Sequence, residues 1–201
     1  MKINLLFFKS IWRKIQRSGY SGLYIENLPF RNGAHRLAAL AFIDVAQVNA
    51  TFDELYDELI SIDDEEGQAG LRELLDYFET TFIRTRNNGQ PLFAPSLWNQ
   101  KGNILSNLPR TNNRCEGWHR HFIGMASTVH PRVIDFIELV KKDMTSSNVK
   151  LDQEESGHAP TPSRPIYLNQ AERIRLILRS QLSNIEITKR IANVFHFNPL
   201  N

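Results

Sequence analysis

Apolar residues recur every three to four positions along most of the chain, and this spacing constrains the fold more than any other feature. In one example, Phe8 is followed by Ile11, Trp12 and Ile15, which is the spacing of one face of an α-helix. No segment shows the strict alternation of apolar and polar residues that is typical of a half-buried strand. The sequence therefore predicts a mainly α-helical protein.

Capping and breaking residues locate several of these helices. Gly19 is expected to end the first one, because glycine is common just after a helix C-terminus. Residues 36–45 are almost all apolar and predict a short buried helix. Thr51, with Glu54 three positions later, forms a capping-box pattern and predicts the start of a helix that pairs with residues 71–82.

The second half of the chain is less regular. Residues 84–113 have no sustained period and predict a long loop, which in a compact domain is usually functional or flexible. Residues 146–165 are rich in Ser, Gln, Glu and Pro and predict a flexible linker. We therefore divide the chain into a helical region over 1–145, a linker over 146–165 and a small C-terminal helical segment over 166–201.

Composition excludes several classes of protein. A chain of 201 residues with 41% hydrophobic residues and a net charge of +2 is not disordered throughout. The single Cys excludes a disulfide framework and fits a reducing compartment. No apolar run approaches the roughly 18 residues of a membrane span, and the apolar run before Lys9 is too short for a signal peptide. The chain also lacks a phosphate loop, a nucleotide-binding glycine fingerprint and a serine elbow, so we expect no small-molecule substrate.

Charge is segregated along the chain. Residues 1–36 and 84–132 are strongly basic, whereas residues 37–83 are strongly acidic. Such blocks indicate either distinct surfaces, one of which faces a polyanion, or solvated helix faces that neutralise one another. Within the first block, basic residues recur every four positions beside Trp12, so they either track phosphates or are merely hydrated. These residues are Lys9, Arg13 and Arg17.

The segment around Glu116 gathers the most functional groups. Glu116 is the only acid between residues 84 and 132, and cations surround it in the sequence. An ionised carboxylate of this kind holds a divalent metal, or it is simply an acid in the first turn of a helix capped by Asn112 or Asn113.

A zinc site is not predicted in this segment. Cys115, His119 and His121 are close in sequence, but zinc needs four ligands and no second Cys or paired His lies at a suitable spacing. A Cys115–His119 nucleophile pair is also weak, because nothing in the sequence supplies a third, orienting group.

Five segments occur in order along the chain: Phe8–Tyr20, Leu37–Ile43, Tyr77–Ile83, Leu97–Asn99 and, above all, Arg110–His119. In order and spacing these segments resemble motifs of Mutator-like element (MULE) transposases found in animal genomes. The likeness covers nearly the whole chain, and the block Ile191–Asn193 resembles the C-terminus of those proteins.

This resemblance implies an RNase H-like core with an all-α insertion, which here spans residues from about 20 to 110. The family's three catalytic acids, two Asp and one Glu, hold two Mg²⁺ or Mn²⁺ ions for attack on DNA phosphodiesters. Glu116 matches the third acid and metal ligand, whereas the strands that bear the two Asp would lie upstream of residue 1. The fold class implied is mainly α: the helical insertion and C-terminal helices of an RNase H-like (DDE) transposase whose β-sheet core is largely missing.

One carboxylate cannot hold two metal ions, so we expect residues 1–201 alone to bind no Mg²⁺ and to cut no DNA. The expected partners are duplex DNA and either the missing N-terminal transposase region or another protein, in the nucleus where the protein functions. The alternative is a non-catalytic helical module, derived from a transposase, that binds nucleic acid or protein. The residues predicted to contact DNA are Lys9, Arg13, Arg17, Arg110, Asn112, Asn113, Arg114, His119 and Arg120.

Overall fold

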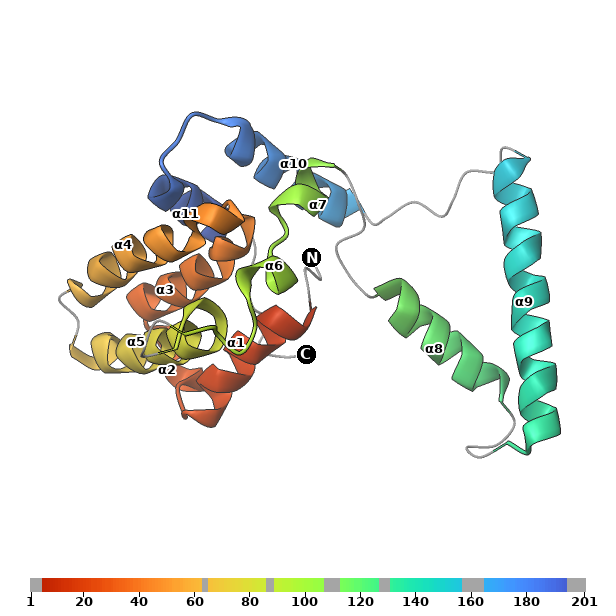
Figure 1. Cartoon of the computed structure of the whole chain (residues 1–201). Helices are drawn as coiled ribbons and strands as arrows, with labels where there is room; N and C mark the ends of the chain where they lie inside the picture. Colours follow the sequence, from red (N-terminus) through yellow and green to blue (C-terminus); the bar gives the residue numbers. More distant parts are fainter. Residues whose placement is uncertain are drawn as a thin grey trace. The chain divides into compact units, whose positions relative to one another are not determined.

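The computed structural model describes residues 5–62, 65–85, 89–106, 113–126, 131–156 and 165–194. For residues 5–6, 65–66, 113–117, 150, 154 and 165–167 it describes the backbone alone. Within these ranges the protein is mainly helical and contains no strand, which confirms the mainly α prediction (Figure 1). The contacts divide the chain into two units, residues 1–110 with 166–201, and residues 111–165.

The first unit contains most of the helices. They are α1 (Leu5–Arg17), α2 (Ser21–Glu26), α3 (Leu28–Ala39), α4 (Val48–Ile60), α5 (Glu65–Phe78), α6 (Pro95–Trp98), α7 (Lys101–Leu105), α10 (Pro165–Arg179) and α11 (Asn184–Ala192). Short 3-10 turns at Leu40–Phe42 and Val45–Gln47 connect α3 to α4, and a π-helical turn at Glu79–Ile83 follows α5. Gly19 has a φ of 79° just after α1, as the predicted helix end requires.

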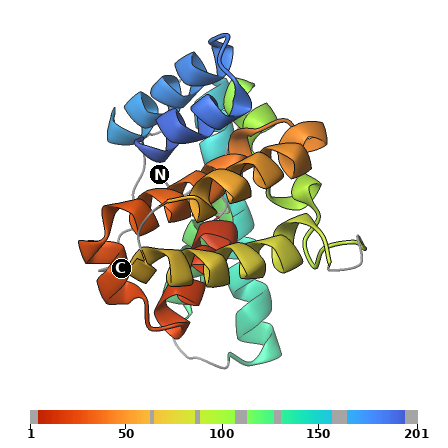
Figure 2. The same ribbon diagram turned by 90° about the vertical axis from the view of Figure 1, so that its left-hand side faces the viewer.

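Helix α3 lies at the centre of this unit. Its residues 33–39 are all buried, and it packs against α5 on one side and α11 on another. Figure 2 shows the resulting order, with α10 and α11 above α3 and α4, and with α5 and α1 below them. The C-terminal segment, expected as a separate module, therefore belongs to the core of the first unit.

An aromatic cluster joins the N-terminal helix to this core. Phe7 of α1 stacks on Trp98 of α6 at 4.7 Å between ring centroids, and it contacts Phe78 and Phe82 edge-on. Phe78 in turn stacks on Phe52 of α4, so the predicted pairing of α4 with α5 is confirmed. Aromatic pairs of this kind contribute beyond their buried area.

Two expectations about local structure need correction. Thr51 does not cap a helix: α4 begins at Val48, and the buried Thr51 hydroxyl donates to the carbonyl of Gln47 inside it. Residues 95–105, expected in a loose loop, form α6 and α7 instead. They are held to the core by the backbone N–H of Gln100, which donates to the Ala41 carbonyl at 2.7 Å, and by the side chain of Asn99.

Among its described residues, the second unit contains the helices α8 (Asn113–Met125) and α9 (Val133–Glu155). The indole N–H of Trp118 donates to the Asp143 carboxylate at 2.7 Å, and Phe122 contacts Phe136 edge-on. Residues 146–155, expected in the linker, form the last turns of α9. The reason is that Leu, Gln and Glu near the end of this stretch favour helix, and the first proline comes at Pro160.

Helix α3 approaches α5 closely at Gly33, so replacing glycine by alanine should change the stability in opposite directions at Gly33 and at Gly22. A Cβ at Gly33 would overlap the buried Leu71 side chain, whereas a Cβ at Gly22 in α2 meets nothing within 4 Å. We expect Gly33→Ala to destabilise the protein by about 1–3 kcal/mol through overpacking. Gly22→Ala should stabilise it by up to about 1 kcal/mol, because alanine favours helix over glycine. Urea unfolding of both variants tests this, and a Gly33→Ala variant as stable as Gly22→Ala would contradict the packing described.

Candidate functional site

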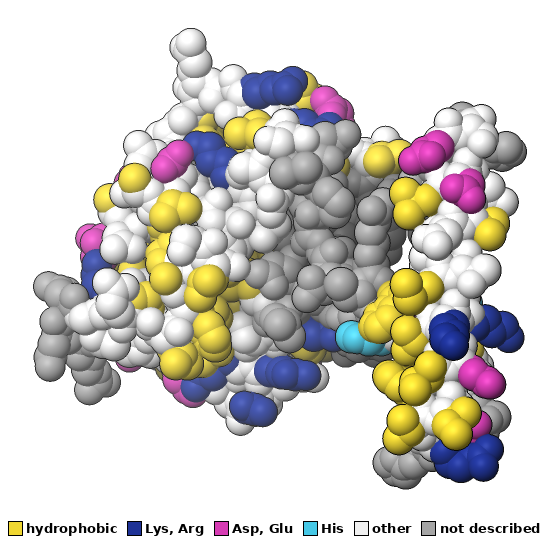
Figure 3. All heavy atoms as spheres, turned by 45° about the vertical axis from the view of Figure 1, so that its right-hand side comes forward, with side chains coloured by type: hydrophobic (Ala, Val, Ile, Leu, Met, Phe, Trp, Pro, Cys, Tyr) yellow, Lys and Arg dark blue, Asp and Glu magenta, His cyan; other side chains and the backbone are white. Residues whose placement is uncertain are grey.

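The outer face of α1 carries three exposed cations, Lys9, Arg13 and Arg17. The opposite face, with Ile11 at its centre, is buried in the core. Four residues of α-helix rise by about 6 Å, so the three side chains emerge one above another over about 12 Å. Figure 3 shows Lys and Arg side chains gathered at the lower edge of the first unit, where α1 lies. We call Lys9, Arg13 and Arg17 the α1 basic stripe.

None of the three stripe residues forms an ion pair with another described side chain. Lys14 on the same helix differs, because its Nζ lies 2.6 Å from Oε1 of Glu73 on α5 and 5.7 Å from the ring centroid of Tyr77. The stripe therefore presents its positive charge to solvent, while the charge of Lys14 is used to attach α1 to α5.

Glu73 fixes the position of α1. Its Oε1 accepts hydrogen bonds from Lys14 Nζ and from the Ser18 hydroxyl, both at 2.6 Å. These bonds, with a further one from Tyr20, lower the pKa of Glu73 from 4.5 to about 2. The same contact with Glu73 raises the pKa of Tyr20. The last turn of α1 is thus held by side chains as well as by its buried face.

Trp12 packs inside the unit and does not extend the stripe. It is half-buried, and its ring meets Tyr24 of α2 edge-on at 5.1 Å. The Tyr24 hydroxyl lies 2.6 Å from Nε2 of the buried His35. Of the two interpretations of Trp12, the structure favours a packing residue between α1 and α2.

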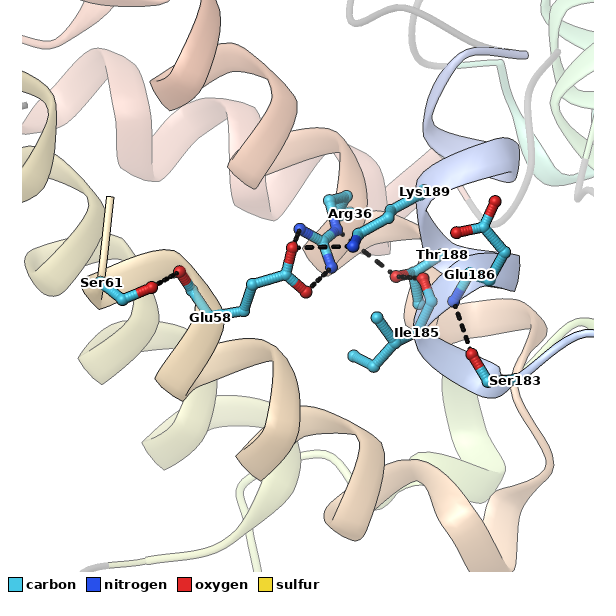
Figure 4. Close-up of polar contacts among 8 residues, drawn as sticks. All are labelled: Arg36, Glu58, Ser61, Ser183, Ile185, Glu186, Thr188 and Lys189. Carbon is cyan, nitrogen blue, oxygen red and sulfur yellow. Dashed lines mark hydrogen bonds and ion pairs between the residues drawn. The ribbon is translucent and has the colours of Figure 1, made fainter. Parts of the chain in front are cut away.

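A second group of charges, which sequence analysis missed, joins α3, α4 and α11 (Figure 4). The Arg36 guanidinium donates to both carboxylate oxygens of Glu58, at 3.0 and 2.8 Å, and its Nε donates to the Thr188 hydroxyl at 3.5 Å. Lys189 Nζ lies 2.9 Å from the same carboxylate. Arg36 above all, with Lys189, lowers the pKa of Glu58 to about 2. No sequence signal could pair Arg36 with Thr188, which lies 152 positions away.

A pocket of about 420 Å³ opens beside this group, between the start of α3 and the ends of α4 and α11. Leu28, Pro29, Leu59 and Ile62 give it a largely apolar lining, and Arg36 and Lys189 are the cations that reach it. Both cations already bind Glu58, so this group stabilises the packing of α11 and offers no activated nucleophile or base.

The remaining predicted DNA-binding residues belong elsewhere. His119 and Arg120 are exposed on α8 of the second unit. The side chains of Asn113, Arg114 and Glu116 lie outside the described part of the structure, although α8 includes their backbone. Arg110 and Asn112 lie outside the described residues altogether.

Metal-ligating groups do not cluster in the described part of the chain. No three His, Cys, Asp or Glu side chains among the residues placed there lie close enough together to hold a metal ion. Because the Glu116 side chain is not among them, the predicted metal ligand is untested. No helix in the described ranges is long and apolar enough to cross a membrane.

Comparison of this chain with family models, with curated proteins and with solved structures gives no match in any of the three. The resemblance to MULE transposases therefore rests on the sequence motifs alone.

The two depressed carboxyl pKa values predict how stability depends on pH. Because Glu58 and Glu73 have pKa values of about 2 in the folded protein and near 4.5 when unfolded, their contribution is fully present above pH 4.5. It is lost as pH falls from about 4.5 to about 2. We expect Glu58→Gln and Glu73→Gln each to lower stability at neutral pH and to flatten its decline in acid.

Chemical denaturation between pH 7 and pH 2 measures this dependence. Glu54→Gln is the matched control, because Glu54 is an exposed acid on α4 with no ion pair to a described side chain. An acid decline as steep in Glu58→Gln as in Glu54→Gln would show that the Arg36–Glu58 contact contributes nothing.

Proposed function

We propose that this chain is part of a Mutator-like transposase and that it binds duplex DNA through the α1 basic stripe. The observation that carries the proposal is the set of three exposed cations, one turn apart on a fixed helix face, without ion pairs to described side chains. DNA phosphates are the polyanion that such a row fits, and their neutralisation releases condensed counterions.

The organisation of α1 supports binding by the stripe in particular. Its buried face and the Glu73 contacts hold the helix in place, so little order has to be gained when the outer face meets DNA. A single row of cations along one helix face fits the phosphate backbone, so we expect contacts with the backbone and weak sequence preference.

The motif resemblance supports the family assignment and gives Glu116 the role of the third catalytic acid. A pair of Mg²⁺ ions needs several carboxylates, and the described side chains provide no group of three ligands. The residues described here do not fit a two-metal centre, and we assign no cleavage step to them. In this proposal residues 1–201 hold DNA and do not cut it.

The salt dependence of DNA binding tests the role of the stripe. Three phosphate contacts predict a slope of about −2.7 for the logarithm of the affinity against the logarithm of salt concentration. We expect Arg13→Ala to weaken binding and to make that slope less steep by about 0.9. Fluorescence anisotropy with a labelled duplex, from about 50 to 200 mM salt, measures both quantities.

Arg190→Ala is the matched control, because it removes an exposed cation of the first unit that lies on α11 and is already paired with Glu186. Circular dichroism verifies that both variants keep their helix content. If affinity barely changes with salt, or if Arg190→Ala and Arg13→Ala change the slope equally, the stripe is not the DNA-binding surface. The alternative of a protein-binding module then takes its place.

A nicking assay tests the absence of cleavage separately. We expect the purified chain to leave supercoiled plasmid intact with Mg²⁺ or Mn²⁺, since one matched acid cannot form the two-metal centre. Metal-dependent nicking that disappears in Glu116→Gln would contradict this part of the proposal and leave the binding test unaffected.

A further inference from the structure

The second unit has no buried side chain among those described for it, in contrast to the first unit. Large apolar residues are exposed on both of its helices, with Val133 at 74% and Ile123 at 70%. Two helices that bury so little apolar surface gain too little to remain ordered in water by themselves. Some other surface is needed to cover them.

The exposed apolar residues of α9 follow a heptad spacing. Val133, Ile137, Val140, Met144 and Leu151 are separated by four, three, four and seven positions, the pattern of a helix that packs along another helix. Four of them are exposed and Val140 is half-buried. We call these five residues the α9 apolar stripe; Figure 3 shows hydrophobic side chains gathered on the surface of the second unit.

Helix α8 does not cover this stripe. The contacts between the two helices use Phe136 and Asp143 of α9, which meet Phe122 and Trp118. At 100° per residue, Phe136 points about 70° and Asp143 about 90° away from the middle of the stripe. The α9 apolar stripe therefore lies beside the contact between the two helices, and that contact leaves it exposed.

We propose that a second copy of this chain covers the α9 apolar stripe, so that two hairpins form a four-helix bundle. The size of the face fits this occupant. Helices of 23 and 13 residues are about 35 and 20 Å long and about 10 Å wide, which gives roughly 550 Å² per partner. That area lies close to the lower end of specific interfaces, at about 600 Å² per partner.

Charge also permits pairing between copies. Residues 113–156 contain six Lys or Arg and seven Asp or Glu, so the hairpin has a formal charge of −1 and two copies do not repel strongly. A nucleic-acid partner, by contrast, is disfavoured by a near-neutral hairpin with an apolar face. Pairing of the hairpins is independent of DNA binding by α1.

Sedimentation equilibrium of the full chain tests the proposal without any variant. We expect a mass that rises toward twice the monomer mass as concentration increases. A chain that remains monomeric up to about 100 μM, where even a weak specific dimer is populated, would overturn the proposal. A mass that rises beyond the dimer without a plateau would also overturn it, because it indicates open-ended aggregation.

The double variant Ile137→Glu with Met144→Glu locates the interface. Two charges placed in an apolar contact should raise the dimer dissociation constant about tenfold or more. Thr145→Glu is the control, because Thr145 is exposed on another side of α9 and its hydroxyl bonds only to the Lys141 carbonyl among described groups. Equal dissociation constants for the double variant and the control would refute the proposed face.

Discussion

The contact between α1 and α5 determines which cation of α1 is paired with an acid and which cations remain exposed on its outer face. The apolar face of α1 is buried, and Glu73 accepts hydrogen bonds from both Lys14 and Ser18. One cation of the helix is thereby neutralised, and the last turn is fixed. Lys9, Arg13 and Arg17 are left on the outer face. The basic segment of the sequence therefore forms a row of exposed cations on a helix that is fixed in place. The proposed binding of DNA rests on this row.

In the same unit, residues that are far apart in the sequence bind one another. Arg36 of α3 binds Glu58 of α4 and Thr188 of α11, so the C-terminal helices complete the core that the N-terminal helices begin. Arg36 is almost fully buried, and a buried guanidinium is tolerated only where its hydrogen bonds are satisfied. Loss of Glu58 would therefore leave a buried charge unpaired and loosen α11.

Local patterns predicted the helical class, the end of α1 at Gly19 and the pairing of α4 with α5, because apolar spacing and glycine act within one or two turns. They could not predict that Lys14 is paired while Arg13 is not, since the difference depends on Glu73, 59 positions away from Lys14. The end of α9 was missed because Ser and Gln near residue 150 were weighted above Leu151 and its neighbours. For Glu116 the described structure offers no test, and its role still rests on a motif.

The most direct test of the account is a site-resolved map of DNA contact. In a titration of the isotope-labelled chain with a short duplex, amide NMR signals report on each residue separately. We expect the perturbed signals to concentrate at Lys9, Arg13 and Arg17, with those of α4 and α11 unchanged. Perturbation concentrated on α8 around Arg120, with α1 unaffected, would contradict the α1 basic stripe as the DNA-binding surface.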